Sequence, residues 1–375
     1  MKITDVRTLV VHAEMRNWVF VKVETDQDGL CGWGEASLEW KTRAVAGCVE
    51  DFKPMLIGED PTRIEHLYQK LYRQSFWRLG AIGMSAISGI EQACWDILGK
   101  SLGVPVYKLL GGGDMRSVYE TFDAAPLIDL AQQVVARGYT AVKVVFVPYS
   151  EPLMGISHVK KFASLMERLR LALGDSIDIM IDFHGRAYPA MAIEYINAVT
   201  EYAPFFCEEP VPPENVDALR QVREAVRVPI ATGERLVTRH QFREIFEKGA
   251  CHVIQPDLCH CGGLLEGKKI AAMAEAYFMG VAPHNPLGPV ANAVALHFAL
   301  STPNFLIQED MLSDVPWRWD VVEHALETKD GYWLPSTQPG LGIRINEKEA
   351  ARHPFQQETI HATTIRAADG AVLDW

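Results

Sequence analysis

The sequence predicts a parallel α/β barrel preceded by a smaller domain of strands and helices. From about residue 117 to residue 309, strand-like segments alternate with helical ones. Six acidic or histidine residues recur here every 23–27 residues, about the length of a strand, a helix and two loops. Each closes a strand-like run, and they are Asp182, Glu208, Glu234, Asp257, His284 and Glu309. Because the parallel strands of a barrel end at one face, these side chains should meet there.

Residues 1–113 are expected to form the smaller α+β domain. The runs KITDVRTLVV and WVFVKVET alternate apolar and polar residues, and a DQDG turn follows them, which is typical of antiparallel strands. From about residue 42 to residue 110, apolar residues such as Ile64, Leu67 and Leu71 keep a helical period. The run Gly111–Gly113 breaks this pattern and marks the predicted boundary.

The barrel domain is predicted to span residues 114–325, with about seven strand–helix units. Its expected strands are 140–147, 177–182, 205–209, 228–234, 252–257, 280–284 and 304–309. The last segment, from about residue 326 to residue 375, is expected to fold back onto the N-terminal domain.

Composition excludes several classes of function. The chain has 375 residues, of which 48% are hydrophobic and 22% charged, as in ordinary globular proteins. A net charge of −12 argues against nucleic acid as a partner, and no apolar run is long enough to cross a membrane. The strand-like N-terminus does not read as a signal peptide, and seven scattered cysteines suit reduced thiols. We therefore expect a cytoplasmic enzyme.

Three carboxylates, from Asp182, Glu208 and Glu234, end three consecutive predicted strands. Placed together they would repel one another unless a cation neutralised them. Oxygen ligands without cysteine or histidine among them favour Mg²⁺. Each acid alone could instead cap a helix or lie on the surface. The regular spacing of all three favours a metal site.

Six short motifs carry a resemblance to a known family. They are DFHGR (182–186), CEEP (207–210), TGER (232–235), QPDLCHCGG (255–263), APHNPLGP (282–289) and QED (308–310). Together they resemble the enolase superfamily and its mandelate racemase subgroup, most closely the sugar-acid dehydratases of the galactonate type. The resemblance covers essentially the whole chain. It implies an α+β capping domain on a modified TIM barrel, (β/α)₇β, and one Mg²⁺ held by Asp182, Glu208 and Glu234.

His284 is the candidate general base. Asp257, on the preceding strand, would orient and stabilise its imidazole, as the acid does in a hydrolytic triad. The resembling family has the same pair at these positions. A buried structural histidine beside a carboxylate is the alternative.

His184 and Glu309 are the other candidate catalytic residues. His184 lies two residues after Asp182, so on a strand both would face the same side. The resemblance implies that His184 protonates the departing 3-hydroxyl; it could instead only hydrogen-bond the substrate. Glu309 could share a proton with the substrate carboxylate or be a surface acid, and its neighbour Asp310 is expected to be solvated.

Position 145 departs from the racemases of the subgroup. Those carry Lys-x-Lys at the end of the first barrel strand, and the second lysine is a base on the opposite face. This chain has Lys143, Val144 and Val145, and valine cannot take a proton. A second base is therefore missing, and Lys143 could still steady the substrate carboxylate.

The expected activity is Mg²⁺-dependent dehydration of a five- or six-carbon, galactonate-like 2R sugar acid to a 2-keto-3-deoxy acid. An epimerase or cycloisomerase, or a catalytically silent sugar-acid-binding protein, is the alternative. The small acid sugar is the expected partner, and the chain is expected to form a homo-oligomer. The particular sugar acid, the role of Lys143 beside Val145 and the oligomer size stay open.

Two further segments were considered for the site. Residues 15–18, expected as a loop, and residues 317–319 could contact substrate hydroxyls. Cys259, His260 and Cys261 suggest zinc, but a tetrahedral site needs four ligands at loop spacing, so we interpret this cluster as incidental.

Overall fold

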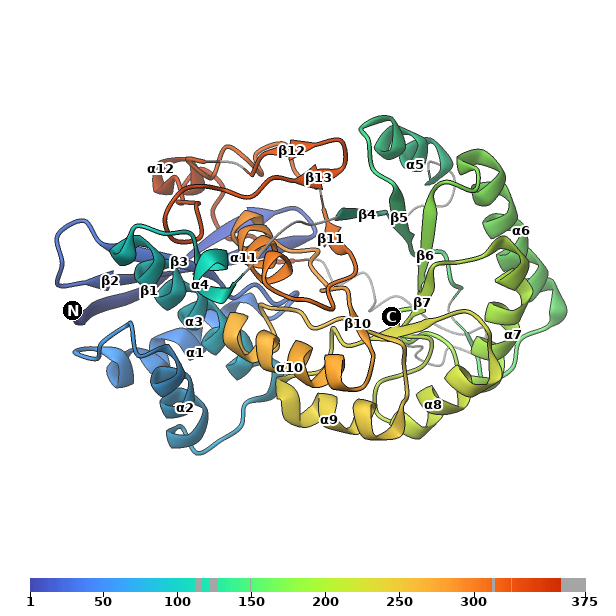
Figure 1. Ribbon diagram of the computed structural model, residues 1–375, viewed down its shortest axis with the longest axis horizontal. Coiled ribbons are helices and arrows are strands. Elements are labelled where there is room, and N and C mark those ends of the chain that lie inside the picture. Colours follow the sequence, from blue (N-terminus) through green and yellow to red (C-terminus); the bar gives the residue numbers. More distant parts are fainter. Residues whose placement is uncertain (112–116, 122–126, 149, 312–313, 325, 359–375) are drawn as a thin grey trace.

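The computed structural model describes residues 1–111, 117–121, 127–148, 150–311, 314–324 and 326–358. An N-terminal sheet with its helices lies at one end of the molecule, and a parallel barrel ringed by helices forms the rest (Figure 1). The predicted fold class is confirmed. Within these residues, no helix is both long and apolar enough to span a membrane.

The N-terminal domain consists of a three-stranded antiparallel sheet covered by helices. Its strands are β1 (Ile3–Ala13), β2 (Arg16–Thr25) and β3 (Cys31–Glu35), in the order β1-β2-β3. Its helices are α1 (Thr42–Leu56), α2 (Ile64–Gln74), α3 (Gly80–Leu102) and α4 (Val106–Leu110). β2 begins at Arg16, so the predicted loop over residues 15–18 is wrong for its last three residues.

The barrel has eight parallel strands in a continuous order. They are β4 (Ser117–Thr121), β5 (Ala141–Val144), β6 (Asp178–Asp182), β7 (Phe206–Glu208), β8 (Ile230–Thr232), β9 (Val253–Ile254), β10 (Gly280–Val281) and β11 (Gln308–Asp310). The sheet runs β10-β9-β8-β7-β6-β5-β4-β11, and a parallel bridge between Val281 and Phe305 closes it. β4 was not among the individually predicted strands, and the observed strands are shorter than the predicted runs.

Helices α5 to α11 surround the barrel (Figure 1). They are α5 (Leu127–Ala136), α6 (Ile156–Leu173), α7 (Pro189–Val199), α8 (Val216–Ala225), α9 (Thr238–Lys248), α10 (Leu264–Ala276) and α11 (Pro289–Leu300), with a 3₁₀ turn at Thr200–Tyr202. The predicted alternation of strands and helices in this part of the chain is therefore confirmed.

The barrel interior explains why the site residues face inward. A buried cluster takes one side chain from each of seven strand segments: Ala141, Met180, Phe206, Ala231, Val253, Ala282 and Ile307. Successive side chains on a strand point to opposite faces, so residues two positions further along also face inward. Lys143, Asp182, Glu208, His284 and Glu309 hold those positions above the apolar cluster.

Two buried carboxylates join the N-terminal domain to the last two barrel helices. Glu91 of α3 accepts the backbone N–H groups of Leu264 and Leu265 at 2.8 and 2.9 Å, at the start of α10. Glu35 of β3 accepts those of Gly288 and Ala291 at 2.8 and 2.9 Å, at the start of α11. The residues before the two helices, Gly263 and Gly288, have no side chain to cap them, and a Cβ at either would collide with the glutamate.

The described part of the C-terminal segment, residues 326–358, contacts the N-terminal domain. It contains β12 (Thr328–Lys329), β13 (Tyr332–Trp333) and α12 (Glu347–Ala350). The backbone N–H of Val106 donates to Gly340 at 2.9 Å, and that of His12 donates to His353 at 2.8 Å. The predicted boundary at 113–114, residue 325 and the tail 359–375 lie outside the described residues.

Candidate active site

Three carboxylates converge at the C-terminal ends of the barrel strands. Asp182 ends β6, Glu208 ends β7, and Glu234 lies in the loop that follows β8. One oxygen from each lies within 4.8 Å of the others, close enough to share one metal ion. Glu208 Oε1 is buried and accepts no hydrogen bond from the described residues. An oxygen-only set of this kind, with one buried oxygen unsatisfied, fits Mg²⁺.

The electrostatics of this cluster also favour a bound cation. Burial and the neighbouring Asp182 raise the pKa of Glu208 to about 8. Burial also raises the pKa of Glu234 well above its usual range. Burial opposes ionisation of Asp182, but His184 and Lys143 outweigh it and lower the pKa of Asp182. The three acids therefore cannot all be ionised easily without another positive charge.

Lys143 supplies one fixed positive charge inside the barrel. Its Nζ lies 3.0 Å from Glu208 Oε2, 2.9 Å from Glu309 Oε1 and 3.8 Å from Asp182 Oδ2. The Lys143 side chain is only 2% exposed, so these contacts are little screened by water. Val145 is also buried and brings no titratable group.

His284 and Asp257 form a hydrogen-bonded pair. His284 Nδ1 lies 2.8 Å from Asp257 Oδ2, and Asp257 Oδ1 accepts the N–H of Cys259 at 2.7 Å. Because a carboxylate accepts, Nδ1 carries the proton and Nε2 faces the site, 3.2 Å from Glu234 Oε2. Burial lowers the pKa of His284, but Glu234, Glu309 and Asp257 raise it well above its usual range.

A left-handed turn places His184 beside the same carboxylates. β6 ends at Asp182, and His184 has φ 50°, so the expected strand alternation is wrong. Its backbone N–H donates to Asp182 Oδ1 at 2.8 Å, and its Nε2 lies 3.0 Å from Asp182 Oδ2. Arg186 Nη2 lies 3.3 Å from the other ring nitrogen. A non-glycine residue in this backbone region is uncommon and is concentrated at functional sites.

Glu309 faces the site and Asp310 faces away from it. Glu309 Oε2 accepts the N–H of Asn285 at 2.9 Å. Asp310 is fully buried, so the prediction that it is solvated is wrong. Its carboxylate accepts Asn292 Nδ2 at 3.0 Å and Trp333 Nε1 at 3.1 Å, and burial raises its pKa to about 6. Neighbours on a strand point to opposite faces, so only one of the two acids could enter the barrel.

A cavity of about 430 Å³ opens above these residues, between the barrel and the N-terminal domain. His184, Glu234 and His284 line its barrel side. Its other lining residues are Met15, Arg16, Leu38, Glu39, Trp40, Ala81, Arg235, Val237, His260 and Pro286. Of the predicted contact residues 15–18, Met15 and Arg16 thus line the cavity. Residues 317–319 do not line it.

Arg235 and His260 are among the lining residues that sequence reasoning missed. Arg235 donates from Nε to Glu209 Oε2 at 2.6 Å. His260 lies beside the Asp257 carboxylate, with its Nδ1 3.6 Å from Oδ2. The i, i+3 spacing of Asp257 and His260 after a strand was the available signal, but we interpreted the Cys-His-Cys run as incidental.

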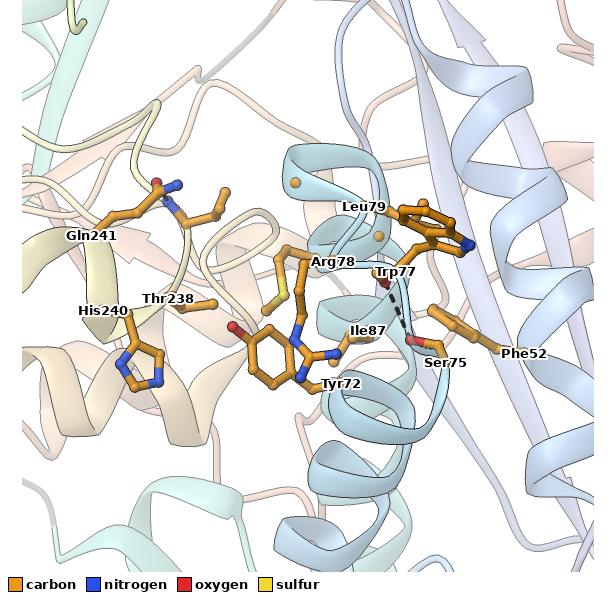
Figure 2. Close-up of a pocket in the computed structure, with 14 residues that line it drawn as sticks. Phe52, Tyr72, Ser75, Trp77, Arg78, Leu79, Ile87, Thr238, His240 and Gln241 are labelled. Atoms are coloured by element: carbon orange, nitrogen blue, oxygen red, sulfur yellow. Dashed lines mark hydrogen bonds between the residues drawn. The ribbon is translucent and has the colours of Figure 1, made fainter.

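A second cavity, of about 190 Å³, lies where the turn between α2 and α3 meets the start of α9 (Figure 2). The Arg78 guanidinium lies over the Tyr72 ring at 4.6 Å, and His240 faces it from α9. None of its lining residues is acidic, whereas Glu39 and Glu234 line the larger cavity.

A parallel barrel with acids and histidines on its strand ends, covered by an N-terminal α+β domain, is the architecture of enolase-type enzymes. Residues 4–111 match the family model "Mandelate racemase / muconate lactonizing enzyme, N-terminal domain", and residues 126–349 match "Enolase C-terminal domain-like". The chain belongs to the mandelate racemase and muconate lactonizing enzyme family of the enolase superfamily.

Relatives and solved structures of similar length match the whole chain. D-galactonate dehydratases of Verminephrobacter eiseniae and Pectobacterium atrosepticum are 38% and 37% identical, over 100% of each chain. The structure of an enolase from Pantoea ananatis with bound D-gluconate and Mg has a TM-score of 0.91 and 31% identity, covering 100% of this chain and 99% of that one. A putative galactarate dehydratase from Agrobacterium radiobacter has a TM-score of 0.93 and 33% identity over 100% of both chains.

Proposed function

We propose that the protein is a Mg²⁺-dependent sugar-acid dehydratase that converts a five- or six-carbon aldonic acid to a 2-keto-3-deoxy acid. The observation that carries this proposal is the pair of histidines that line one cavity beside the carboxylate cluster, with His184 3.0 Å from Asp182 and His284 3.2 Å from Glu234. Full-length relatives named D-galactonate dehydratase support it. A base and a separate acid at one site are what removal of a proton and a hydroxyl group requires.

Asp182, Glu208 and Glu234 would hold the metal ion. When bound there, Mg²⁺ supplies positive charge beside the substrate carboxylate, which makes loss of the neighbouring C2 proton less costly. Lys143 would add to that charge from the barrel interior. Glu309 in its protonated form would share its proton with an oxygen of the substrate carboxylate, and the N–H of Asn285 positions its Oε2.

His284 and His184 would take the two proton-transfer steps. His284 Nε2 removes the C2 proton, and the electrons of that C–H bond move toward the carboxylate. They then return to form the C2–C3 double bond as the C3–O bond breaks, and His184 donates the proton with which the hydroxyl leaves as water. The resulting enol takes a proton at C3, gives up the proton of its C2 hydroxyl and becomes the ketone. Asp257 keeps the proton of His284 on Nδ1 throughout.

The absence of a base at Val145 disfavours epimerisation. An epimerase needs proton donors on both faces of C2, and Val145 leaves the face opposite His284 without the lysine of the racemases. By family resemblance, the reacting face corresponds to 2R acids such as galactonate or gluconate. A catalytically silent binder would need neither the His284–Asp257 pair nor a second histidine.

A screen of hexonic and pentonic acids for 2-keto product, with and without EDTA, tests the proposal. We expect keto acid from a small set of 2R acids, and none after the metal is removed. Interconversion of C2 epimers without keto acid would favour the epimerase instead. Binding of a sugar acid without any exchange of its α-proton in D₂O would favour the silent binder.

We also propose that the chain forms a homo-oligomer. The turn between α2 and α3 exposes Phe76, Trp77 and Leu79 by 76%, 71% and 50%, and exposed apolar groups of this size often mark contacts between chains. Light scattering of the purified protein should give a multiple of 41.9 kDa, and Trp77→Ser should lower the mass. A monomeric wild type would contradict this.

We place the protein in the cytoplasm. All seven cysteines are unpaired, and six of them are buried. Cell fractionation should recover the activity with cytoplasmic markers, and recovery with periplasmic or secreted markers would contradict the assignment.

A further inference from the structure

We propose that His260 is a positioning residue that orients the Asp257–His284 pair and ties it to the segment of the N-terminal domain that walls the cavity. The proposal rests on the proposed function in one respect, that His284 acts as the base. His260 lines the cavity and is nevertheless only 6% exposed.

A hydrogen bond to Ser37 fixes the orientation of the His260 ring. Its Nε2 lies 2.8 Å from the carbonyl oxygen of Ser37, and since a carbonyl only accepts, Nε2 must carry a proton. This contact turns Nδ1 toward Asp257 Oδ2, at 3.6 Å. The same oxygen accepts His284 Nδ1 at 2.8 Å. The Asp257 carboxylate therefore lies between two imidazoles. A rotation of the His260 ring would leave the carboxylate without a neighbour on that side.

Ser37 belongs to a segment that is attached to the barrel on both sides of His284. Ser37 Oγ donates to Glu35 Oε1 at 2.7 Å, and Glu35 holds the start of α11, just after His284 in the chain. The next residues, Leu38, Glu39 and Trp40, line the cavity opposite the barrel. His260 thus connects the cavity wall to the base across the domain boundary.

A metal or zinc role for this cluster does not fit the contacts. Atoms of Asp257, His260 and His284 lie within 4.8 Å of one another, but the 2.8 Å separation between Asp257 and His284 is a hydrogen bond that an ion would have to replace. The Cys259 thiol lies 3.7 Å from Gln92 Nε2, and burial raises its pKa well above the usual range. The His260 ring is therefore held within the protein by its hydrogen bond to Ser37.

Two substitutions separate the two edges of the imidazole. His260→Gln places an amide N–H where Nε2 lies and keeps a donor for Ser37, while His260→Asn places its amide near Nδ1 and loses the hydrogen bond to Ser37. The matched control is Ser88→Ala. Ser88 Oγ accepts the N–H of Gly262 at 3.0 Å, so it also joins the N-terminal domain to this loop, but it does not contact Asp257.

The first readout is exchange of the substrate α-proton in D₂O at saturating substrate. We expect both His260 variants to exchange about 10- to 100-fold more slowly, the usual effect of losing a residue that orients a functional group. KM should rise only in His260→Asn, which releases the wall segment, and Ser88→Ala should stay within about twofold of wild type. Wild-type exchange in His260→Gln, or an equal loss in Ser88→Ala, would overturn the proposal.

The second readout needs no substrate. The N–H of His284 bonded to Asp257 should give a far-downfield proton resonance, assigned by its absence in His284→Asn. We expect His260→Gln to shift or broaden it and Ser88→Ala to leave it unchanged. An unchanged resonance in His260→Gln would overturn the proposal even if no sugar acid reacts. If wild type makes no keto acid while the resonance does respond, only the proposed function fails.

Discussion

Lys143 Nζ lies 3.0 Å from Glu208 Oε2, which puts an ammonium group against a predicted metal ligand at the centre of the barrel. Like charges repel strongly where water is excluded, so this lysine should weaken metal binding while helping to hold the substrate carboxylate. We predict that Lys143→Met binds Mg²⁺ more tightly and loses at least about 10-fold in kcat/KM.

Calorimetric titration with Mg²⁺ and steady-state kinetics measure the two effects. Lys161→Met, on the exposed side of α6, is the control and should change neither. Weaker Mg²⁺ binding in Lys143→Met would show that the lysine supports the metal site instead.

The metal prediction concerns Glu208. Glu208→Gln should abolish dehydration and leave the fold intact, because an amide keeps the shape and loses the charge that the cation needs. Circular dichroism and Mg²⁺ titration check the variant, and Glu244→Gln on α9 is the exposed control. Full turnover after EDTA treatment and dialysis would refute the metal requirement.

Substitution of the two histidines should block different steps of the reaction. In His184→Asn the base and the acids remain, so the α-proton should still exchange in D₂O, while keto acid falls by about 10²–10⁴-fold without the general acid. His284→Asn should lose both exchange and dehydration. Proton NMR of the substrate measures exchange, and a keto-acid assay measures product. The reverse pattern would mean that base and acid are interchanged.

Only one C2 configuration should react. His284 approaches C2 from one side, and Val145 provides no base on the other. Initial rates for pairs of C2 epimers, such as gluconate and its epimer, measure this. Comparable rates for both members of a pair would contradict a single base.

Acid should destabilise the protein through His297 of α11. Burial lowers the pKa of His297 to about 4, and its Nδ1 accepts the N–H of Tyr107 at 2.8 Å. The unfolded chain takes up a proton near the ordinary pKa of about 6.5, and the folded chain does not until about pH 4. The contribution of neutral His297 to the free energy of unfolding is fully present above about pH 6.5. It decreases as the pH falls toward 4, and roughly 2 kcal/mol of it is lost at pH 5.

His297→Gln keeps an acceptor and cannot titrate. Its free energy of unfolding in urea should therefore fall less than that of wild type between pH 7 and pH 5. The difference between the two proteins isolates His297 from other titrating groups. Identical pH dependence in both would refute the assignment.

Residues that follow the period of the barrel could be predicted from the sequence. Asp182, Glu208 and Glu309 lie two positions beyond an inward apolar side chain, and strand alternation is a local property. Asp310 could have been placed by the same rule, because a neighbour of an inward residue must face the helices. β4 is less apparent, because its five residues, SVYET, include only one strongly apolar side chain.

Contacts between distant parts of the chain could not be predicted. His260 is hydrogen-bonded to the carbonyl of Ser37, 223 residues away in the sequence, and the residues around His260 do not predict this contact. His184 reaches Asp182 through a left-handed turn, which the following Gly185 permits but does not require. The site residues that end strands or stand in the family motifs could thus be predicted, whereas the contact of His260 with the N-terminal domain could not.

Two glutamates of the N-terminal domain accept the first N–H groups of α10 and α11. The folding of the barrel domain therefore depends on the N-terminal domain. Without Glu91, α10 would begin after Gly263 with unsatisfied N–H donors, and without Glu35 the same would hold for α11 at Gly288. Exchange of the N-terminal domain between relatives is therefore restricted. A chimera that joins this barrel to a relative's N-terminal half should assemble only where that half also presents carboxylates at these two places, so the halves must be inherited as a pair.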